Sequence, residues 1–444
     1  MSRKSSLFPA GIRQMSALLL TLHLLACSSP KKAADPMPEK PRQTAPRQES
    51  PRQETPGPGT PRKPQASSTR FTDLMATRPD LFKPILENPE SYRVQAIWTH
   101  ITRDGQGKPH FEEHQLNTVP PDTYFYPAST VKMPTALLAL QRVRELGIPG
   151  LDRNSTMITG AEYSGQSPVQ NDPTAWDGRP SIAQYVRKIF LVSDNDAFNR
   201  LYEFLGPSYI NKELHDRGYA EAQIQHRLEI SLTEDENRHT NPIAFYDTSG
   251  VKLYEQPMQL NRDAYPRRDD ALGKGYYKND VLYQGPMDFS RKNRLSLNSL
   301  NQILKSIMFP ESVPAKQRFR VSDDDLAFVR KYMSMVPSAA KYPPYDGNEF
   351  WDTYCKFLYF GSEKDARIPP TLKVFNKVGD AYGYLLDIAY FKDDANGVEF
   401  MLSAVIYCNS DGILNDSRYD YDTIGFPFMK NLGKLIYDEE VKMK

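Results

Sequence analysis

Strand patterns at both ends of the folded region constrain the fold more than any other feature of this 444-residue chain. Near the C-terminus three segments have the apolar, β-branched character of strands, and Asn396-Gly397 marks a hairpin turn between the last two. These segments are 372–378, 384–391 and 398–407. Two more strands are expected at 92–102 and 110–116, and the residues between the two groups follow mostly helical patterns. The sequence therefore predicts an α/β (α+β) fold, with one antiparallel sheet built from both termini and flanked by helices, plus a mostly helical lobe.

Helical patterns also stand at the two ends of this region. One runs over 73–87 and is expected to be interrupted near Pro79 and Pro84, and another runs over about 424–444. We expect these two segments to cover the sheet.

The first 69 residues have the composition of an export signal and a linker. Basic residues precede an apolar run at 15–26 that is too short to span a bilayer as a helix. The run ends at Leu24-Leu25-Ala26-Cys27, which resembles the lipobox of bacterial lipoproteins, although simple secretion with an incidental Cys27 is the alternative. Residues 28–69 are rich in proline and predict a disordered linker. We expect a signal at 1–27 and an exported lipoprotein, anchored to a membrane at Cys27 and facing the periplasm or the cell surface.

Residues 70–444 are expected to form the folded domain. The formal charge of the whole chain is +1, and the signal and linker hold its basic excess, so this region is acidic and has no basic run interleaved with aromatic residues. We therefore expect no nucleic-acid partner, and we expect a monomer. Cys355 and Cys408 remain as candidates for a disulfide, but the sequence leaves open whether they pair.

Ser129 and Lys132 stand at the start of a well-marked helix pattern, in which an apolar stripe runs to Val143 and Gly147 provides the stop. If the helix starts at Ser129, the two side chains project from the same face of its first turn. The positive end of the helix lowers the pKa of the amine and can also stabilise an oxyanion. Lys132 is therefore a candidate base for Ser129 as a nucleophile.

Two further polar groups are candidate partners of Ser129. Ser193-Asp194-Asn195 lies on a tight connection between helices expected at 181–191 and 196–205, where short side chains can point into a cleft. Helix capping is the alternative role for this triplet. Later in the chain, Lys377 ends a strand and is followed two residues on by Gly379, whose missing Cβ lets a ligand approach the backbone. An ordinary turn is the alternative there.

Taken in order, the motifs that begin at Ser129, Ser193 and Lys377 resemble the S-x-x-K, S-D-N and K-T-G set of serine β-lactamases and penicillin-binding proteins. Residues 227–233 resemble the omega loop of class A β-lactamases, and Glu229 is its acidic residue. The resemblance implies a β-lactamase-like fold over nearly all of the folded region. It also implies a serine hydrolase that works through an acyl-enzyme and needs no metal and no cofactor.

The resemblance further implies a role for each matching residue. Ser129 would attack a carbonyl, with Lys132 as the base or Glu229 acting through a water. The backbone N–H groups of Ser129 and Asp380 would form the oxyanion hole. Ser193 would relay a proton to the leaving nitrogen, Asn195 would form a hydrogen bond with the substrate amide, and Lys377 would offer positive charge to a substrate carboxylate. Glu229 would activate the deacylating water. Gly379 and Thr233 would contact the substrate.

Three residues depart from the family pattern. Val378 lacks the hydroxyl that would bind a substrate carboxylate, a hydrogen bond worth roughly 1.5–3 kcal/mol. Thr233 replaces an Asn that positions water, and Asp380 places a carboxylate close to the oxyanion site unless its side chain turns away. The long interval between Glu229 and Lys377 predicts an insertion over about 245–325, with a hairpin at 243–256 and a helix near 297–307.

His110-Phe111-Glu112-Glu113-His114 fits the H-x-x-E-H pattern of inverted zinc peptidases. That chemistry needs both histidines on one face of a helix, whereas the surrounding residues predict a strand. We therefore predict no metal site there.

β-Lactam hydrolysis is the activity that the omega-loop glutamate favours. A peptidoglycan DD-peptidase or an esterase with the same acylation machinery is the alternative. A catalytically weakened wall-binding module is a third possibility, for which Val378 and Asp380 are the sequence signs.

Overall fold

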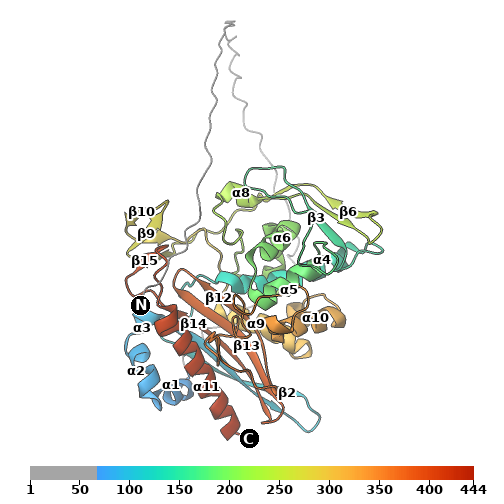
Figure 1. The fold of residues 1–444 in the computed structure, drawn as a ribbon. Helices are drawn as coiled ribbons and strands as arrows, with labels where there is room; N and C mark the ends of the chain where they lie inside the picture. The colour runs from blue at the N-terminus through green and yellow to red at the C-terminus, as the bar shows by residue number, and fades with distance from the viewer. Residues whose placement is uncertain (1–67) are drawn as a thin grey trace, which may run out of the picture. The chain divides into compact units, whose positions relative to one another are not determined.

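The computed structural model describes residues 68–444, and its centre is a five-stranded antiparallel sheet. The strand order is β12-β13-β14-β1-β2. The strands are β1 (Gln95–Arg103), β2 (Pro109–Asn117), β12 (Leu372–Ala381), β13 (Tyr384–Asp393) and β14 (Val398–Tyr407). β1 pairs with β14, so the two ends of the folded region meet inside one sheet (Figure 1). The predicted fold class is confirmed, and the turn at Asn396-Gly397 joins β13 to β14 as expected.

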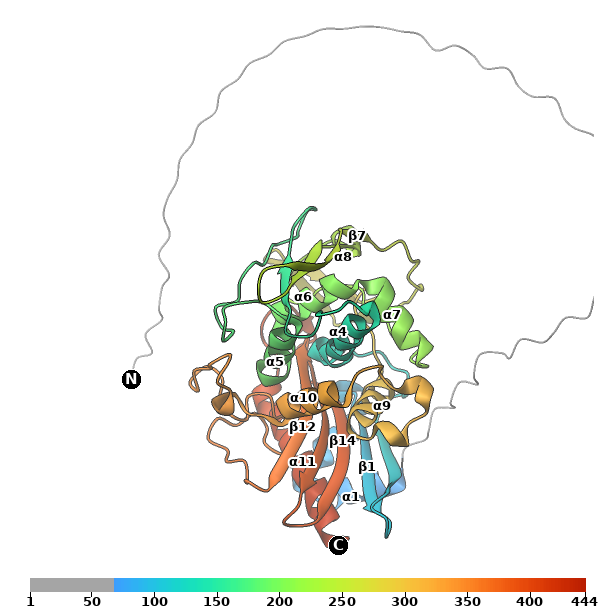
Figure 2. The ribbon, with the colours of Figure 1, turned by 90° about the vertical axis from the view of Figure 1, so that its right-hand side faces the viewer.

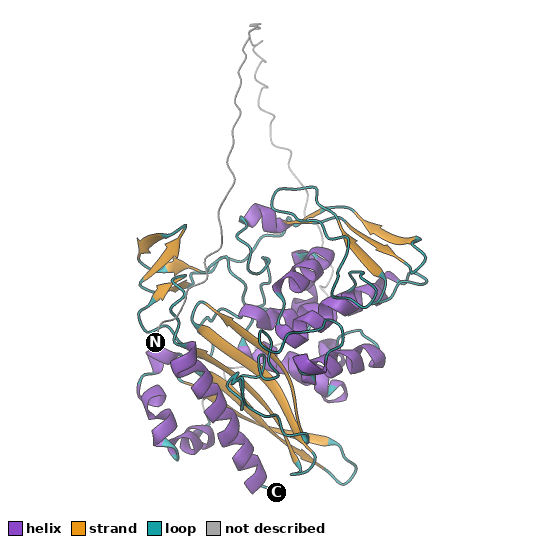
Figure 3. Ribbon diagram, viewed as in Figure 1, coloured by secondary structure: helices purple, strands orange, loops and turns teal. Residues whose placement is uncertain are grey.

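Helices from both ends of the chain cover one face of the sheet (Figure 3). They are α1 (Thr69–Ala76), α2 (Pro79–Glu87), the short α3 (Pro89–Tyr92) and α11 (Phe426–Lys442), which follows a π-turn at Tyr421–Gly425. Large apolar side chains such as Phe71, Phe82 and Phe428 pack there against the sheet. The predicted interruption at Pro79 separates α1 from α2, whereas Pro84 lies inside α2. The expectation of a break at Pro84 was wrong, because a proline inside a helix removes one hydrogen bond without necessarily ending the helix.

The helical lobe lies beside the opposite face of the sheet (Figure 2). Its helices are α4 (Lys132–Leu146), α5 (Ile182–Val192), α6 (Asn195–Leu205) and α7 (Pro207–Asp216), and α9 (Leu297–Met308) and α10 (Asp323–Ser334) lie between them and the strands. The termini agree with the sequence signals, since Ser181 caps α5 through the amide of Gln184 and Gly147 ends α4 at φ 61°.

The region of the predicted insertion contains several small strands. β5 (Ile243–Tyr246) and β6 (Lys252–Gln256) form the expected hairpin, and β5 also pairs with β3 (Thr156–Thr159). β9 (Gly275–Lys278), β10 (Val281–Gln284) and β15 (Ile413–Leu414) form a second small sheet. The remaining elements are α8 (Glu234–Arg238), the pair β4 (His239–Thr240) and β7 (Gln259–Leu260), and the pair β8 (Ala271–Leu272) and β11 (Met287–Asp288). Helix α9, which lies within the predicted insertion, packs on the central sheet and so belongs to the core of the fold.

Several other sequence features have a clear place in the fold. The His110–His114 motif lies in β2, as its strand pattern predicts. Cys355 and Cys408 are both buried and both carry free thiols. Within residues 68–444, no helix is both long and apolar enough to cross a bilayer. Cys27 and the predicted linker at 28–69, apart from its last two residues, lie outside the described residues.

Candidate active site

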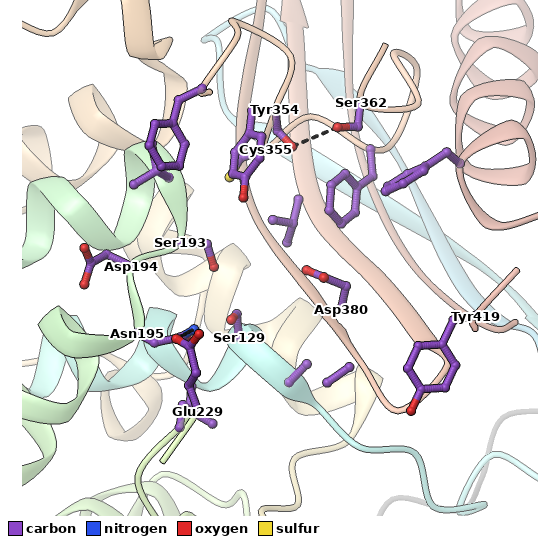
Figure 4. A pocket seen from close by; sticks show the side chains of 18 of the residues that line it. Ser129, Ser193, Asp194, Asn195, Glu229, Tyr354, Cys355, Ser362, Asp380 and Tyr419 are labelled. Atoms are coloured by element: carbon purple, nitrogen blue, oxygen red, sulfur yellow. Dashed lines mark hydrogen bonds between the residues drawn. The ribbon is translucent and has the colours of Figure 1, made fainter. Parts of the chain in front are cut away.

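A cavity of about 1110 Å³ lies where edge strand β12 meets the helical lobe. Its lining comes from the turn before α4, the α5–α6 connection, the omega-loop segment at Leu228 and Glu229, strand β12, and two stretches at 350–363 and 415–427. Ser129, Ser193, Asn195, Glu229 and Asp380 all line it (Figure 4). Segments that are far apart in the sequence therefore place the main predicted site residues around one space.

Ser129 lies in a 3-10 turn, η1 (Ala128–Val131), and the α-helix begins only at Lys132. The expectation that Ser129 opens the α-helix was therefore wrong by one turn. The geometric consequence survives, because residues i and i+3 of a 3-10 turn lie one above the other on the same side. Ala128 adopts φ 45°, an unfavourable conformation for a residue with a Cβ, so the turn bearing Ser129 is held by its surroundings.

Lys132 is completely buried and uses its amine to join the turn to the α5–α6 connection. The amine donates to the carbonyl oxygen of Ser193, to Ser193 Oγ at 3.4 Å and to Asn195 Oδ1 at 2.6 Å. Burial holds the pKa of Lys132 well below its usual range, and the charge of Lys377 lowers it further. The direction agrees with the sequence prediction, but the main cause is burial rather than the end of the helix.

Ser193 connects two lysines. Lys377 is also buried, and its Nζ donates to Ser193 Oγ at 2.7 Å and to the carbonyl oxygen of Val378 at 2.8 Å. Burial lowers the pKa of Lys377 to about 8. The Ser193 hydroxyl therefore lies between two amines that give up a proton more readily than an exposed lysine does. This is the arrangement that a proton relay requires.

The capping alternative for the triplet is also realised. Ser193 ends α5 in the left-handed conformation with φ 60°, and the Asp194 carboxylate caps α6 by accepting from the amide of Ala197 at 2.7 Å. The two helix ends fix the backbone of the connection. They thereby aim Ser193 Oγ and the Asn195 amide at the lysines and the cavity.

Glu229 reaches the same cluster from the omega-loop segment. Its Oε2 accepts from Asn195 Nδ2 at 2.6 Å, and the residue adopts φ 66°. The segment is anchored by the neighbouring Arg227, whose buried guanidinium donates to Glu203 Oε1 at 2.8 Å. Arg227 therefore has a structural role that holds Glu229 at the edge of the cavity.

Thr233 does not come to the cavity. Its hydroxyl caps α8 by accepting from the amide of Glu236 at 3.1 Å, and the Glu236 carboxylate binds the Thr233 amide in return. This corrects the expectation of a substrate contact at Thr233. Threonine with glutamate three residues later is a capping-box pattern, and this signal was present in the sequence.

Gly379 allows a close backbone contact, but the partner is the protein itself rather than a ligand. A Cβ at this position would lie 3.1 Å from the Ser129 nitrogen and 3.1 Å from the Pro127 oxygen. Glycine therefore lets β12 pack directly against the turn that bears Ser129. This contact also places Asp380 beside that turn.

Asp380 and Val378 alternate with Lys377 and Gly379 along β12, and both line the cavity. The Asp380 side chain points into the cavity and does not turn away (Figure 4). Asp380 is exposed to the cavity, and the surrounding protein atoms raise the pKa of its carboxyl against the lowering influence of Lys377 and Lys132.

The aromatic wall at 350–363 was not predicted. Phe350, Trp351, Tyr354 and Phe357 line the cavity there, together with Cys355. A buried polar network holds this segment to the sheet. Its contacts run from the amides of Phe357 and Leu358 to Asp387 Oδ2 at 3.1 and 2.9 Å, and from Lys356 Nζ to Asn376 Oδ1 at 2.6 Å. Burial raises the pKa of Asp387 to about 6 and lowers that of Lys356 to about 8. The one available signal was the lone acidic residue in the apolar stretch Tyr384–Phe391.

Backbone strain gathers around the cavity. Eleven non-glycine residues of the described chain have positive φ, and seven of them line it. These seven are Ala128, Ser193, Glu229, Ser362, Tyr382, Asn415 and Ser417. Such conformations cost about 1–3 kcal/mol each and concentrate at functional sites. The strain therefore favours this cavity as a candidate functional site independently of the sequence motifs.

Comparison with known proteins gives one family match. The pattern of the β-lactamase enzyme family matches residues 109–253, a segment that includes Ser129, Lys132, Ser193 and Glu229. The match supports a β-lactamase-like hydrolase. It ends before Lys377, so the contribution of β12 to this β-lactamase-like site rests on the geometry described above. No curated protein matches the chain in sequence.

Three solved structures of β-lactamases are similar to the chain. The protein from Desulfarculus baarsii is 13% identical with a TM-score of 0.45, and the alignment covers 84% of this chain and 99% of that one. The protein from Xanthomonas campestris is 12% identical with a TM-score of 0.45, covering 83% and 97%. The protein from Sphaerobacter thermophilus is 10% identical with a TM-score of 0.45, covering 84% and 98%.

Proposed function

We propose that this protein is a serine hydrolase that forms an acyl-enzyme on Ser129 and hydrolyses it with the help of Glu229. The observation that carries the proposal is the convergence of Lys132 and Lys377 on Ser193 Oγ in the cavity that Ser129 lines. A structural cap alone does not need two buried amines with lowered pKa values on one hydroxyl.

In the acylation step, Ser129 Oγ forms a bond to the substrate carbonyl carbon and loses its proton to a base. Lys132 in its neutral form is one candidate base, because burial lowers its pKa, and Glu229 acting through a water is the other. The bond from carbon to the leaving group then breaks, and Ser193 Oγ gives the leaving atom a proton that the neighbouring lysines replace. The backbone amides of Ser129 and Asp380 are the proposed donors to the oxyanion.

In the deacylation step, a water attacks the ester carbonyl and gives a proton to Glu229. The bond from the carbonyl carbon to Ser129 Oγ then breaks, and the proton returns to Ser129 Oγ, which restores the serine hydroxyl and the Glu229 carboxylate. Glu229 lines the cavity and is oriented by Asn195, which supports this role. β-Lactam hydrolysis is the first candidate reaction, because an omega-loop glutamate that completes turnover separates a class A β-lactamase from a covalently inhibited penicillin-binding protein.

A second candidate is the hydrolysis of a peptidoglycan peptide or of an ester. The lining at β12 favours an ester or a peptide whose leaving group has no carboxylate, because the apolar Val378 and the acidic Asp380 face the cavity where such a carboxylate would need a donor. A wall-binding module without turnover would keep the same cavity but would not depend on Ser129.

We further propose that the protein works outside the cytoplasm as a lipoprotein. The signal pattern, the lipobox-like Cys27 and the linker support this location. The proposed partners are a small acyl substrate and, through the lipid on Cys27, a membrane.

Intact-mass analysis during the reaction with a chromogenic cephalosporin tests the proposed function. Rapid colour with a transient adduct on the peptide that contains Ser129 would establish a β-lactamase, and a stable adduct without turnover would indicate a penicillin-binding protein. Glu229→Gln is expected to slow deacylation by about 100-fold or more, since general bases contribute roughly 10²–10⁴-fold. An adduct that persists in Ser129→Ala would refute Ser129 as the nucleophile.

A further inference from the structure

The lining of the active-site cavity is charged with one sign only. Among its 28 lining residues there are six carboxylates and no lysine, arginine or histidine. The six are Asp194, Asp196, Glu229, Glu363, Asp380 and Asp422. The Lys132 and Lys377 amines behind Ser193 offset this negative charge at one place, so the part of the cavity away from Ser193 is the part that favours cations over anions.

Four of these carboxylates have partners in the protein. Asp194 caps α6, and Glu229 accepts from the Asn195 amide. Asp196 is 3.4 Å from the Arg200 guanidinium, and Glu363 forms an ion pair with a lysine of α11. Within residues 68–444, by contrast, no side chain or amide forms a hydrogen bond or an ion pair with the carboxylates of Asp380 and Asp422. Asp380 also lies on the strand that packs directly against the Ser129 turn.

The amine of Lys377 on this strand is buried, and Lys377 is not among the residues that line the cavity. Lys377 Nζ already donates to Ser193 Oγ and to the Val378 carbonyl oxygen. Val378 itself has no donor on its side chain. Strand β12 reaches the proposed leaving-group donor Ser193 through Lys377. The residues of this strand that line the cavity present an apolar side chain and then a free carboxylate, which is unsuited to an anion and suited to a cation.

Aromatic rings complete a site of this kind. Tyr354, Phe357, Tyr382 and Tyr419 line the cavity, and Asp380 lies between Tyr354 and Tyr419 in Figure 4. Aromatic faces attract ammonium groups, most strongly where water is partly excluded. A cavity that holds an unpaired carboxylate and several aromatic rings is therefore suited to an organic cation.

We propose that the physiological substrate carries an ammonium group on the leaving-group side of its scissile carbonyl, and that Asp380 binds this group. The inference rests on the proposed serine hydrolase activity and names the substrate class of that site. Asp380 is then a specificity-determining residue, and acyl compounds with a carboxylate in this position are poor substrates. Penicillins carry such a carboxylate, so this inference places the second candidate reaction, hydrolysis of an ester or a peptide, ahead of β-lactam hydrolysis for the physiological substrate.

Three thioesters with one acyl group test the inference. Phenylacetyl thioesters of thiocholine, 2-mercaptoethanol and thioglycolate have a cationic, a neutral and an anionic leaving group. Ser129 Oγ would form the ester bond as the carbon–sulfur bond breaks, the thiolate would take a proton, and water would later release phenylacetate. The released thiol measures turnover, and Ser129→Ala gives the spontaneous rate.

We expect the cationic thioester to have a kcat/KM about tenfold or more above that of the anionic one, a ratio that corresponds to about 1.4 kcal/mol. Asp380→Asn should remove most of this ratio, and Asp380→Glu should keep it. Asp438→Asn, which removes the same charge from the exposed face of α11, should leave it unchanged. The Glu variant distinguishes loss of charge from damage to the fold.

Two outcomes overturn the inference separately from the proposed function. If all three thioesters are hydrolysed in a Ser129-dependent way without a charge preference, or if Asp380→Asn keeps the preference, the ammonium site is refuted and the hydrolase stands. If no thioester reacts above the rate of Ser129→Ala and no acyl adduct forms, the proposed function fails and the inference fails with it.

Discussion

Gly379→Ala is a sharp test of how β12 positions the nucleophile. The new Cβ would lie 3.1 Å from the Ser129 nitrogen, 3.1 Å from the Pro127 oxygen and 3.2 Å from the Ala128 Cβ. A methyl carbon ordinarily approaches other heavy atoms no closer than about 3.5 Å, so each of these three distances is a few tenths of an ångström too short. Two of the three contacted atoms belong to the backbone, so no side-chain rotation relieves the overlap.

The turn and the strand must therefore move apart. Overpacking of this kind costs about 1–3 kcal/mol, whereas a displacement approaching 1 Å in a reacting group can cost on the order of 100-fold in rate. We expect Gly379→Ala to remain folded with a moderately lower melting temperature. Its acylation rate should fall much more than this loss of stability suggests.

The assay combines thermal unfolding with the rate of adduct formation on Ser129, followed by intact mass. Gly105→Ala is the matched control, because a Cβ on Gly105 meets no atom within 4 Å and the residue lies in the distant turn between β1 and β2. If Gly379→Ala acylates at the rate of the wild type, the contact between β12 and the Ser129 turn does not position the nucleophile.

Three other predictions follow from the charged groups. Arg227→Ala removes one of the two buried arginines that pair with Glu203 and leaves Arg200 at 3.1 Å, so we expect a loss of about 3 kcal/mol, the lower end of the range for a broken buried pair, in the free energy of unfolding by urea. Deacylation should also slow because Glu229 loses its anchor, and unchanged unfolding would refute the role of the pair. If the Lys377 ammonium is needed at Ser193, the acylation rate should decline as pH rises through about 8, because Lys377 then loses its proton. The pH–rate profile of Lys377→Arg should lack this inflection, because arginine stays charged. Because the pKa of Asp387 is raised to about 6, the native state binds more protons than the unfolded state between roughly pH 4 and 6, and this contribution to stability is lost as pH rises through 6. Asp387→Asn should be less stable at every pH, and its urea unfolding should lack this part of the pH dependence.

The fold was predictable because its signals are local and redundant. Each long strand carries its own apolar pattern, the turn at Asn396-Gly397 sets one hairpin, and Ser181 and Gly147 mark helix ends. Pro84 was misread because a sequence shows that a proline removes a donor but does not show whether the packing of the helix compensates for it.

The site was predictable only in part. The motifs at Ser129, Ser193 and Lys377 are short and continuous in the sequence, and the structure brings them together at one cavity. The aromatic wall at 350–363 has no motif, since its position depends on contacts with Asp387, some 24–37 residues further along the chain. Long-range contacts between buried polar groups leave no periodic pattern in a sequence, and this is why the extent of the cavity was not foreseen.

The α5–α6 connection shows why a structural and a catalytic reading of the same residues do not compete. The end of α5 holds Ser193 at φ 60°, and Asp194 fixes the start of α6 by capping it. The Ser193 hydroxyl can accept hydrogen bonds from both Lys132 and Lys377 only if it stays in one position. The end of α5 and the start of α6 hold it there before the reaction begins, so little conformational entropy is lost during the reaction. Asp194→Ala should therefore lower the acylation rate as well as the stability, even though the Asp194 carboxylate itself has no proposed part in the chemistry. A mutant that loses only stability, with the acylation rate of the remaining folded protein unchanged, would show that the cap and the relay are independent.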